Sequence, residues 1–238
     1  MLPAVNEWLA TPLGRMLLAQ ERAIVAAALE RAFGIYCVQL GDWGGAGEFL
    51  AAARTRRQAL LASAPAPGAA LVCELTSLPL QTDSVDVLLL PHTLEFVDDP
   101  HELLREAGRV LNGEGELIAL AFEPLGGWSL RDALTRGGFP PGLRRLVSAR
   151  RLTDWLRLVG FEVGRAERYQ YAPPLAGLQA GRAGALFERL GRKAWPRLSG
   201  AYLLRARKRV YTMTPVRTRQ RLRTAVIGGL VEPARRAS

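Results

Sequence analysis

Apolar and polar positions change their period several times along the chain. Residues 6–33 carry apolar side chains at helical spacing, with Thr11 and Pro12 as a start signal. After Gly34 the pattern changes to short, nearly continuous apolar runs, which predict buried strands. These runs are Ile35–Leu40, Gln58–Ser63, Leu71–Leu75, Val85–Leu90 and Glu116–Phe122. Strands that alternate with helices predict a parallel sheet covered by helices.

Helical patterns accompany these strands. We expect a short helix at Glu48–Arg54, a longer one that Asp99 caps and Pro100 begins, and another that Ser148 caps. Asn112-Gly113 ends the second of these and Gly160 ends the third.

Two further strands complete the expected sheet. Phe161 begins the sixth, and Ala201–Thr212 forms the seventh, whose alternation of basic and apolar residues suits a sheet edge. The fold class is therefore α/β, a doubly wound, mostly parallel, seven-stranded Rossmann-like sheet with helices on both faces.

Three parts follow from this pattern. Residues 1–34 form an N-terminal helical segment, and residues 35–212 form the sheet domain. Within that domain, segments 123–147 and 172–200 lack clear periodicity and are expected as irregular insertions, while residues 213–238 form a basic tail. The first insertion follows the fifth strand, so it is expected near the carboxyl ends of the strands, where ligands bind in such sheets.

The glycine-rich turn after the first strand is the first candidate for a ligand site. Gly41, Gly44, Gly45 and Gly47 lie between that strand and the next helical stretch. Glycine permits positive φ and close approach of a ligand to the backbone. The free N–H groups of a following helix attract an anionic ligand group.

The charge is distributed unevenly. The 238 residues have a formal net charge of +10, yet residues 1–181 carry 17 basic and 20 acidic side chains. Residues 182–238 carry 15 basic and 2 acidic ones, so they are a candidate surface for an acidic partner such as nucleic acid or an anionic membrane. A solvated, solubilising tail is the alternative interpretation.

Composition limits the remaining classes. Apolar residues make up 49% of the chain, enough for a full core, and no apolar run approaches the roughly 20 residues that cross a bilayer. No signal peptide is recognisable, so a cytoplasmic location is expected. Cys37 and Cys73 lie in apolar runs and are expected as free thiols, and two cysteines with two histidines predict no metal site.

Several linked motifs resemble class I S-adenosylmethionine-dependent methyltransferases of the type 11 subgroup. The resemblance covers roughly residues 35–163. Its pieces are Leu40-Gly41 before the glycine turn, Glu74-Leu75-Thr76-Ser77-Leu78-Pro79-Leu80, Ser84-Val85-Asp86-Val87, Leu94-Glu95-Phe96-Val97-Asp98-Asp99-Pro100, the run from Glu106 through Arg109-Val110-Leu111 to Gly115-Glu116-Leu117, and Gly160-Phe161-Glu162-Val163.

This resemblance implies a site for S-adenosylmethionine. The backbone from Gly41 to Gly45 would border the amino-acid part of the cofactor, with Gln39, Asp42 and Trp43 beside it. Ser63 would lie at the ribose.

The remaining implied contacts follow the third and fourth strands. Glu74 would accept a hydrogen bond from the adenine amino group, and the Leu75 backbone would meet the ring. Pro91 and His92 would face the sulfonium and the methyl acceptor, with His92 as a candidate general base or as a residue that only lines the pocket.

The first motif departs from the family pattern at three positions. Gln39 stands where an acid is usual, Trp43 replaces a glycine, and no acid follows the second strand near Ser63. Two hypotheses remain open. The protein is a methyltransferase for an unidentified acceptor, or it is a methyltransferase-like binding module without catalysis that contacts RNA or another anionic partner through residues 182–238. Trp43 discriminates between them, because a side chain in the crevice would favour the binding module.

Overall fold

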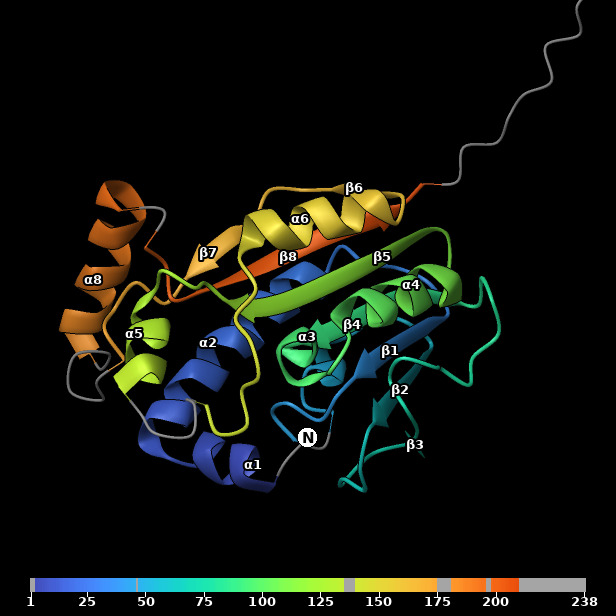
Figure 1. Ribbon diagram of the computed structural model, residues 1–238, viewed down its shortest axis with the longest axis horizontal. Helices are drawn as coiled ribbons and strands as arrows, with labels where there is room; N and C mark the ends of the chain where they lie inside the picture. Colours follow the sequence, from blue (N-terminus) through green and yellow to red (C-terminus); the bar gives the residue numbers. More distant parts are fainter. Residues whose placement is uncertain (1–2, 46, 135–139, 175–180, 196–197, 210–238) are drawn as a thin grey trace, which may run out of the picture.

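The computed structural model describes residues 3–45, 47–134, 140–174, 181–195 and 198–209, and its centre is one twisted sheet (Figure 1). The strand order is β3-β2-β1-β4-β5-β8-β6, and β7 also pairs with β8. The strands are β1 Tyr36–Leu40, β2 Arg57–Ala62, β3 Leu71–Val72, β4 Val85–Pro91, β5 Leu111–Phe122, β6 Phe161–Val163, β7 Glu167–Tyr169 and β8 Ala201–Lys208. The pairs among β1 to β5 are parallel, and β8 is antiparallel to its three neighbours.

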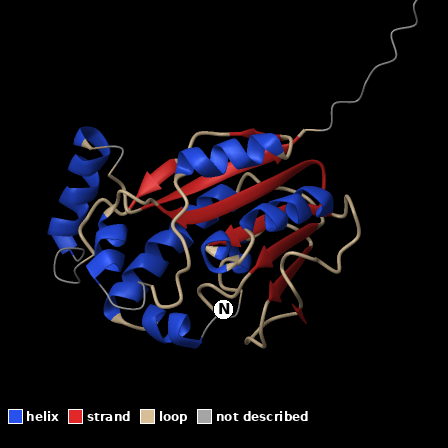
Figure 2. Cartoon of the chain, viewed as in Figure 1, coloured by secondary structure: helices blue, strands red, loops and turns tan. Residues whose placement is uncertain are grey.

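Helices cover both faces of the sheet (Figure 2). Alternate residues of each central strand enter two separate clusters of buried side chains. Leu89 of β4 packs in the cluster with α2, whereas Leu88 and Leu90 pack in the cluster with α4 and α6. The helices are α1 Pro3–Leu9, α2 Pro12–Leu29, α3 Thr93–Phe96, α4 Pro100–Val110, α5 Gly127–Leu134, α6 Ala149–Leu158 and α8 Gly181–Ala194. The predicted fold class is therefore confirmed, with β7 as one strand more than expected.

The helix starts agree with the capping signals. Thr11 Oγ1 accepts a hydrogen bond from Gly14 N at the start of α2. Asp99 accepts from two backbone N–H groups of α4, and Ser148 accepts from one at α6. One or two N–H donors of each first turn are thus satisfied by the capping side chain.

The helical element after the glycine turn is shorter than expected. Where we expected a helix at Glu48–Arg54, a 3-10 turn spans Leu50–Ala52. Phe49 and Leu50 are buried against the α2 side of the sheet, so this segment contributes apolar side chains to the core on that side.

The expectation for the last strand was wrong. β8 is not an edge strand, because it lies between β5 and β6. Its basic residues are compensated by neighbouring carboxylates: Arg205 Nε lies 2.5 Å from Glu116 Oε1 on β5, and Lys208 Nζ lies 2.6 Å from Asp83 Oδ1. An interior strand therefore tolerates alternating charges where its partners supply the opposite sign.

Both insertions expected to be irregular contain a helix. α5 lies within 123–147 and α8 within 172–200. The proposed basic tail, 213–238, falls outside the described residues, as does part of each insertion. Among the described residues no helix is both long and apolar enough to cross a membrane.

Candidate functional site

A cavity of about 210 Å³ lies beside the carboxyl ends of β1 and β2 and against α3. It adjoins a hollow of about 370 Å³ that extends past Cys73, Glu74 and Thr76. Both spaces share Ser63, Leu75, Phe96, Val97 and Arg144. The rest of the cavity lining comes from Gly41, Ala64, Thr93 and Gly142.

Gly41 shapes the floor of this cavity. Its φ is 86°, and its N–H donates to Leu61 O at 2.8 Å, which ties the turn to β2. A Cβ at this position would lie 3.1 Å from Thr93 Oγ1 and would have to adopt a conformation that side chains rarely take. Gly45 has φ of 75°, and no atom lies within 4 Å of the place that a Cβ would take, so the backbone there is open to approach.

Trp43 packs beneath the turn and not in the cavity. Its side chain is fully buried, and Nε1 donates to Glu21 Oε2 of α2 at 2.7 Å. Its ring lies 4.3 Å from the ring of His92 and 6.0 Å from that of Phe122. The glycine-to-tryptophan change thus fills the space between turn and sheet and leaves the described cavity clear.

His92 is placed differently from our expectation. It is fully buried and lines neither the cavity nor the adjoining hollow. Its Nε2 lies 2.9 Å from Glu21 Oε1 and its Nδ1 lies 2.6 Å from Glu95 Oε2. Both ring nitrogens are therefore occupied by carboxylates, so in this conformation His92 does not meet an acceptor as a base.

The charges around His92 fix its protonation. Burial lowers the pKa of His92, but the carboxylates of Glu21 and Glu95 outweigh burial and raise that pKa to about 9. An imidazolium donates from both nitrogens, which matches two carboxylate partners. Burial raises the pKa of Glu95, while His92 and the Phe122 N–H act in the opposite direction. We call Glu21, Trp43, His92, Glu95 and Tyr169 the buried polar cluster.

This cluster joins distant parts of the chain around α3. Tyr169 on β7 donates its hydroxyl to Glu21 Oε1 at 3.2 Å, and Glu95 Oε1 accepts from Phe122 N at 2.8 Å. His92 has φ of 55°, a costly conformation for a residue other than glycine. The cluster holds this turn, and with it the residues of α3 that line the cavity.

The other predicted residues divide into two groups. Ser63, Glu74 and Leu75 line the cavity or the hollow, and their contacts with a cofactor stay a prediction. Gln39, Asp42 and Pro91 are buried and line neither space. Asp42 Oδ2 accepts from Asn6 at 3.2 Å, and Gln39 Nε2 donates to Gly41 O at 2.8 Å, so both support the turn from below.

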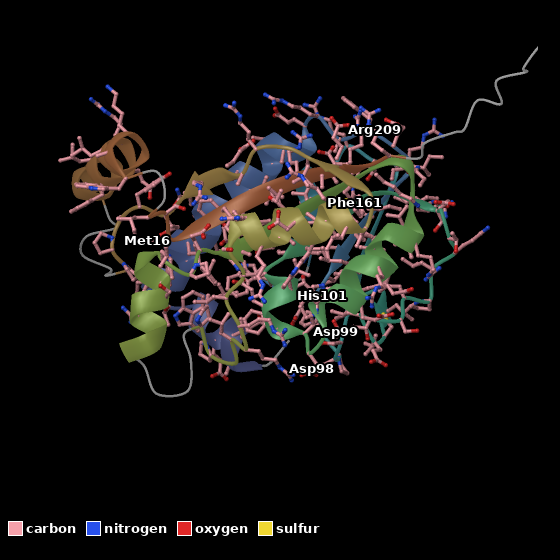
Figure 3. The ribbon with its side chains drawn as sticks, turned by 45° about the horizontal axis from the view of Figure 1, so that its top comes forward. Met16, Asp98, Asp99, His101, Phe161 and Arg209 are labelled. Atoms are coloured by element: carbon pink, nitrogen blue, oxygen red, sulfur yellow. The ribbon has the colours of Figure 1, made fainter. Side chains whose placement is uncertain are left out.

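Residues 140–147 lie near the carboxyl ends of the strands, where the first insertion was expected, but sequence reasoning did not name Arg144. Arg144 lines both spaces and forms an ion pair with Asp98. Its backbone N–H donates to Glu95 O at 3.1 Å, which fastens this segment over α3. Figure 3 shows Asp98 beside Asp99 at the beginning of α4. Periodicity carried no signal here, since the segment is neither helix nor strand.

The polar groups of this region suit a ligand with donors and a flat apolar part. Leu75 and Phe96 supply apolar surface, and the exposed carboxylate of Glu74 supplies an acceptor. Gln39 Oε1 is buried next to the turn without a hydrogen-bond partner among the described residues. Because Gln39 lines neither space, this acceptor lies beneath the turn and outside the region that a ligand could reach.

The fold and a family model point to the same class. Residues 34–119 match the family model of a methyltransferase domain, and this match includes the glycine turn, Ser63, Glu74 and α3. The parallel sheet with an inserted antiparallel strand completes the architecture. The fold is that of class I methyltransferases, and the sequence of residues 34–119 resembles a methyltransferase domain. The cofactor of such a domain is S-adenosylmethionine, and the lining residues fit its adenosyl part.

The likeness in fold to solved structures extends over most of the chain. A Thermotoga maritima protein described as an S-adenosylmethionine-dependent methyltransferase, possible histamine N-methyltransferase, has a TM-score of 0.61 at 19% identity, covering 86% of this chain and 94% of its own. A putative Haloferax volcanii methyltransferase, solved with a methyltransferase activator, has a TM-score of 0.60 at 19% identity, covering 87% and 98%. Identities this low establish the fold alone.

A sequence relative covers a smaller part. The uncharacterized protein YafS of Escherichia coli strain K12 is 44% identical over 98 residues. The match spans 40% of this chain and 40% of that protein, so it concerns part of each molecule.

Proposed function

We propose that the methyltransferase domain binds S-adenosylmethionine in the cavity beside Gly41 and transfers its methyl group to an acceptor that is still unidentified. The observation that carries this proposal is the continuous lining from Gly41 through Ser63 to Glu74 and Leu75, together with the match of residues 34–119 to a methyltransferase domain. The cofactor supplies an electrophilic methyl group on a sulfonium.

The protein's own groups would orient the ligand. Leu75 and Phe96 would contact the base, and the Glu74 carboxylate would accept from its amino group. Ser63 offers a neutral hydroxyl to the ribose, whereas a carboxylate would hold both ribose hydroxyls with charged hydrogen bonds. This difference corresponds to a contact weaker by about 1–3 kcal/mol.

No histidine, lysine or tyrosine lies among the described residues that line the two spaces. We therefore place the catalytic contribution in orientation and exclusion of water, which a displacement at a sulfonium methyl chiefly requires. The position of Trp43 favours this proposal over the inactive binding module, because its side chain is directed away from the cavity.

Titration calorimetry of the full chain with S-adenosylhomocysteine tests the proposal. We expect saturable binding, and Gly41→Ala should weaken it by about tenfold or more, because the new Cβ strains the turn and crowds Thr93. Gly160→Ala is the matched control, since Gly160 has φ of 96° but no atom within 4 Å of the place of a Cβ, and it lies far from the turn in sequence. Absence of binding at millimolar ligand would refute the proposal.

A further inference from the structure

α8 packs against the protein through its smallest side chains. Gly184 and Gly191 are buried, and a Cβ at Gly191 would lie 2.5 Å from Tyr171 Cβ. Glu188, on the same side, accepts from Tyr171 N through Oε1 at 2.7 Å. The described inner side of this helix is therefore made of glycine and one carboxylate, which is the reverse of a usual amphipathic surface helix.

Large apolar side chains of the helix face solvent. Leu186, Phe187 and Leu190 are 55%, 39% and 51% exposed. Just beyond the helix, Trp195 and Leu198 are 59% and 51% exposed. We call these five residues the α8 apolar patch. Single exposed leucines are common, but five large apolar side chains within thirteen positions mark a contact surface.

The described charged side chains that α8 exposes have one sign. Arg189 and Lys193 are exposed, and Glu188, the one acidic residue in the sequence of α8, is bonded inward to Tyr171 N. Residues 182–238 carry 15 basic and 2 acidic side chains in total. An apolar stripe with exposed cationic neighbours matches a surface that is apolar inside and anionic outside.

The position of α8 leaves it accessible. It stands at one end of the molecule in Figure 1, beyond α5, and its described contacts with other elements are mainly to β7. Phe161 and Arg209 lie at the other end in Figure 3. A flat surface can thus approach α8 without meeting the body of the sheet.

We propose that the α8 apolar patch docks the protein on an anionic phospholipid surface. Leu186, Phe187 and Leu190 enter the boundary between headgroups and acyl chains, while Arg189 and Lys193 contact the phosphates. A second copy of this chain fits less well, because its patch would bring the same positive charges together. Nucleic acid would use the cationic groups but gains nothing from the leucines.

Flotation with vesicles tests this proposal on the full chain. One set contains phosphatidylglycerol and phosphatidylcholine, and the other contains phosphatidylcholine alone. We expect binding to the anionic set that weakens as salt rises. The double variant L186S/L190S should bind the vesicles at least tenfold more weakly, because two apolar side chains that would move from water into the lipid boundary are removed.

Leu158→Ser is the matched control, since Leu158 is 85% exposed on α6, outside the patch. It should bind as the unchanged protein does. Trp195 supplies a second readout, because vesicles should protect its fluorescence from acrylamide, and a W195F variant identifies its share of the signal.

Four results would overturn the proposal. The first is equal vesicle binding by L186S/L190S and L158S, and the second is no binding to the anionic set at low salt. The third is a dimer in light scattering that L186S/L190S abolishes, without vesicle binding. The fourth is vesicle binding that survives L186S/L190S but is lost in a full chain with R217Q, R219Q, R221Q and R223Q, since it would assign the contact to those arginines.

Discussion

The glycine turn separates two regions that treat polar groups in opposite ways. Beneath it, the buried polar cluster pairs each ring nitrogen of His92 with a carboxylate, and Glu21 also accepts from Trp43 and Tyr169. Above it, the cavity and the hollow meet Ser63, Glu74 and Arg144, all of them exposed or half-exposed. The lower region is fixed by internal partners, and the upper one presents its polar groups where a ligand can reach them.

This difference predicts which changes affect stability and which affect binding. In a dry site, an unpaired charge or donor is costly, because no water replaces the lost partner. In a solvated crevice, water partly replaces a lost hydrogen-bond or charge partner. A substitution there should therefore change ligand affinity more than protein stability. The following changes separate the two regions.

The largest effect is expected from Glu21→Ala. The change leaves Trp43 Nε1, His92 Nε2 and the Tyr169 hydroxyl without their common acceptor. Breaking a buried pair from one side costs about 3–5 kcal/mol. Guanidinium unfolding measures this loss of stability. Glu30→Ala is the control, because Glu30 is an exposed carboxylate at the end of the same helix, and it should change stability by less than about 0.5 kcal/mol. A loss below about 1 kcal/mol for Glu21→Ala would mean that the cluster is not closed to water.

The pH dependence of stability is the next largest effect. The pKa of His92 rises from 6.5 to about 9 on folding, so its stabilisation is complete below pH 6.5 and is lost as the pH rises through 9. We expect the free energy of unfolding to fall by about 2–3 kcal/mol between roughly pH 6.5 and pH 8.5.

Two other buried groups, Glu95 and Cys37, also make the free energy of unfolding depend on pH. Burial also raises the pKa of Glu95, so the stabilisation from this group is likewise lost as the pH rises, beginning at a lower pH. Burial raises the pKa of Cys37 to about 12, and the stabilisation from this thiol is lost above the range from roughly pH 6.5 to pH 8.5. Urea unfolding at several pH values measures the slope, and His92→Gln should flatten it. An unchanged slope in His92→Gln would assign the effect to another group.

A gain of affinity is expected from Ser63→Asp. A carboxylate at this position, directly after β2, would accept from both hydroxyls of a ribose. We expect S-adenosylhomocysteine to bind up to about tenfold more tightly, with little change in stability because the site is exposed. Ser77→Asp, also exposed and in the loop after β3, controls for the added charge. Equal affinities for the two variants would place the ribose elsewhere.

The smallest effect is expected from Arg144→Gln. Arg144 and Asp98 are half-exposed and largely exposed, so solvent screens their ion pair. Calorimetry should show less than about a fivefold loss of S-adenosylhomocysteine affinity, and Asp98→Asn should change it less than that. A hundredfold loss would show that the guanidinium contacts the ligand directly.

Local signals in the sequence were enough for the parallel half of the fold. β1, β4 and β5 are apolar runs, and the helices that Asp99 and Ser148 cap begin where the capping side chains predicted. Ser63 and Leu75 were named through the resemblance of the motifs to methyltransferases, and in the structure both line the cavity.

The missed features depend on contacts between distant residues. Glu21 and His92 are separated by 71 positions, so nothing near either residue indicates that they pair. His92 was expected at the acceptor because it follows a strand end, but its left-handed backbone turns the ring into the core. α8 was missed because its apolar side chains point outward, whereas helix recognition assumes an inward apolar face.

The place of β8 in the sheet has a consequence for synthesis. β6 and β7 pair with β8 in the described sheet, and the contact from Phe122 to Ala201 closes a long loop. The ribosome therefore releases β6 and β7 before the strand that holds them exists. Until residue 208 has emerged, the edge of β5 stays open and apolar, so the nascent chain passes through a stage that favours chaperone binding.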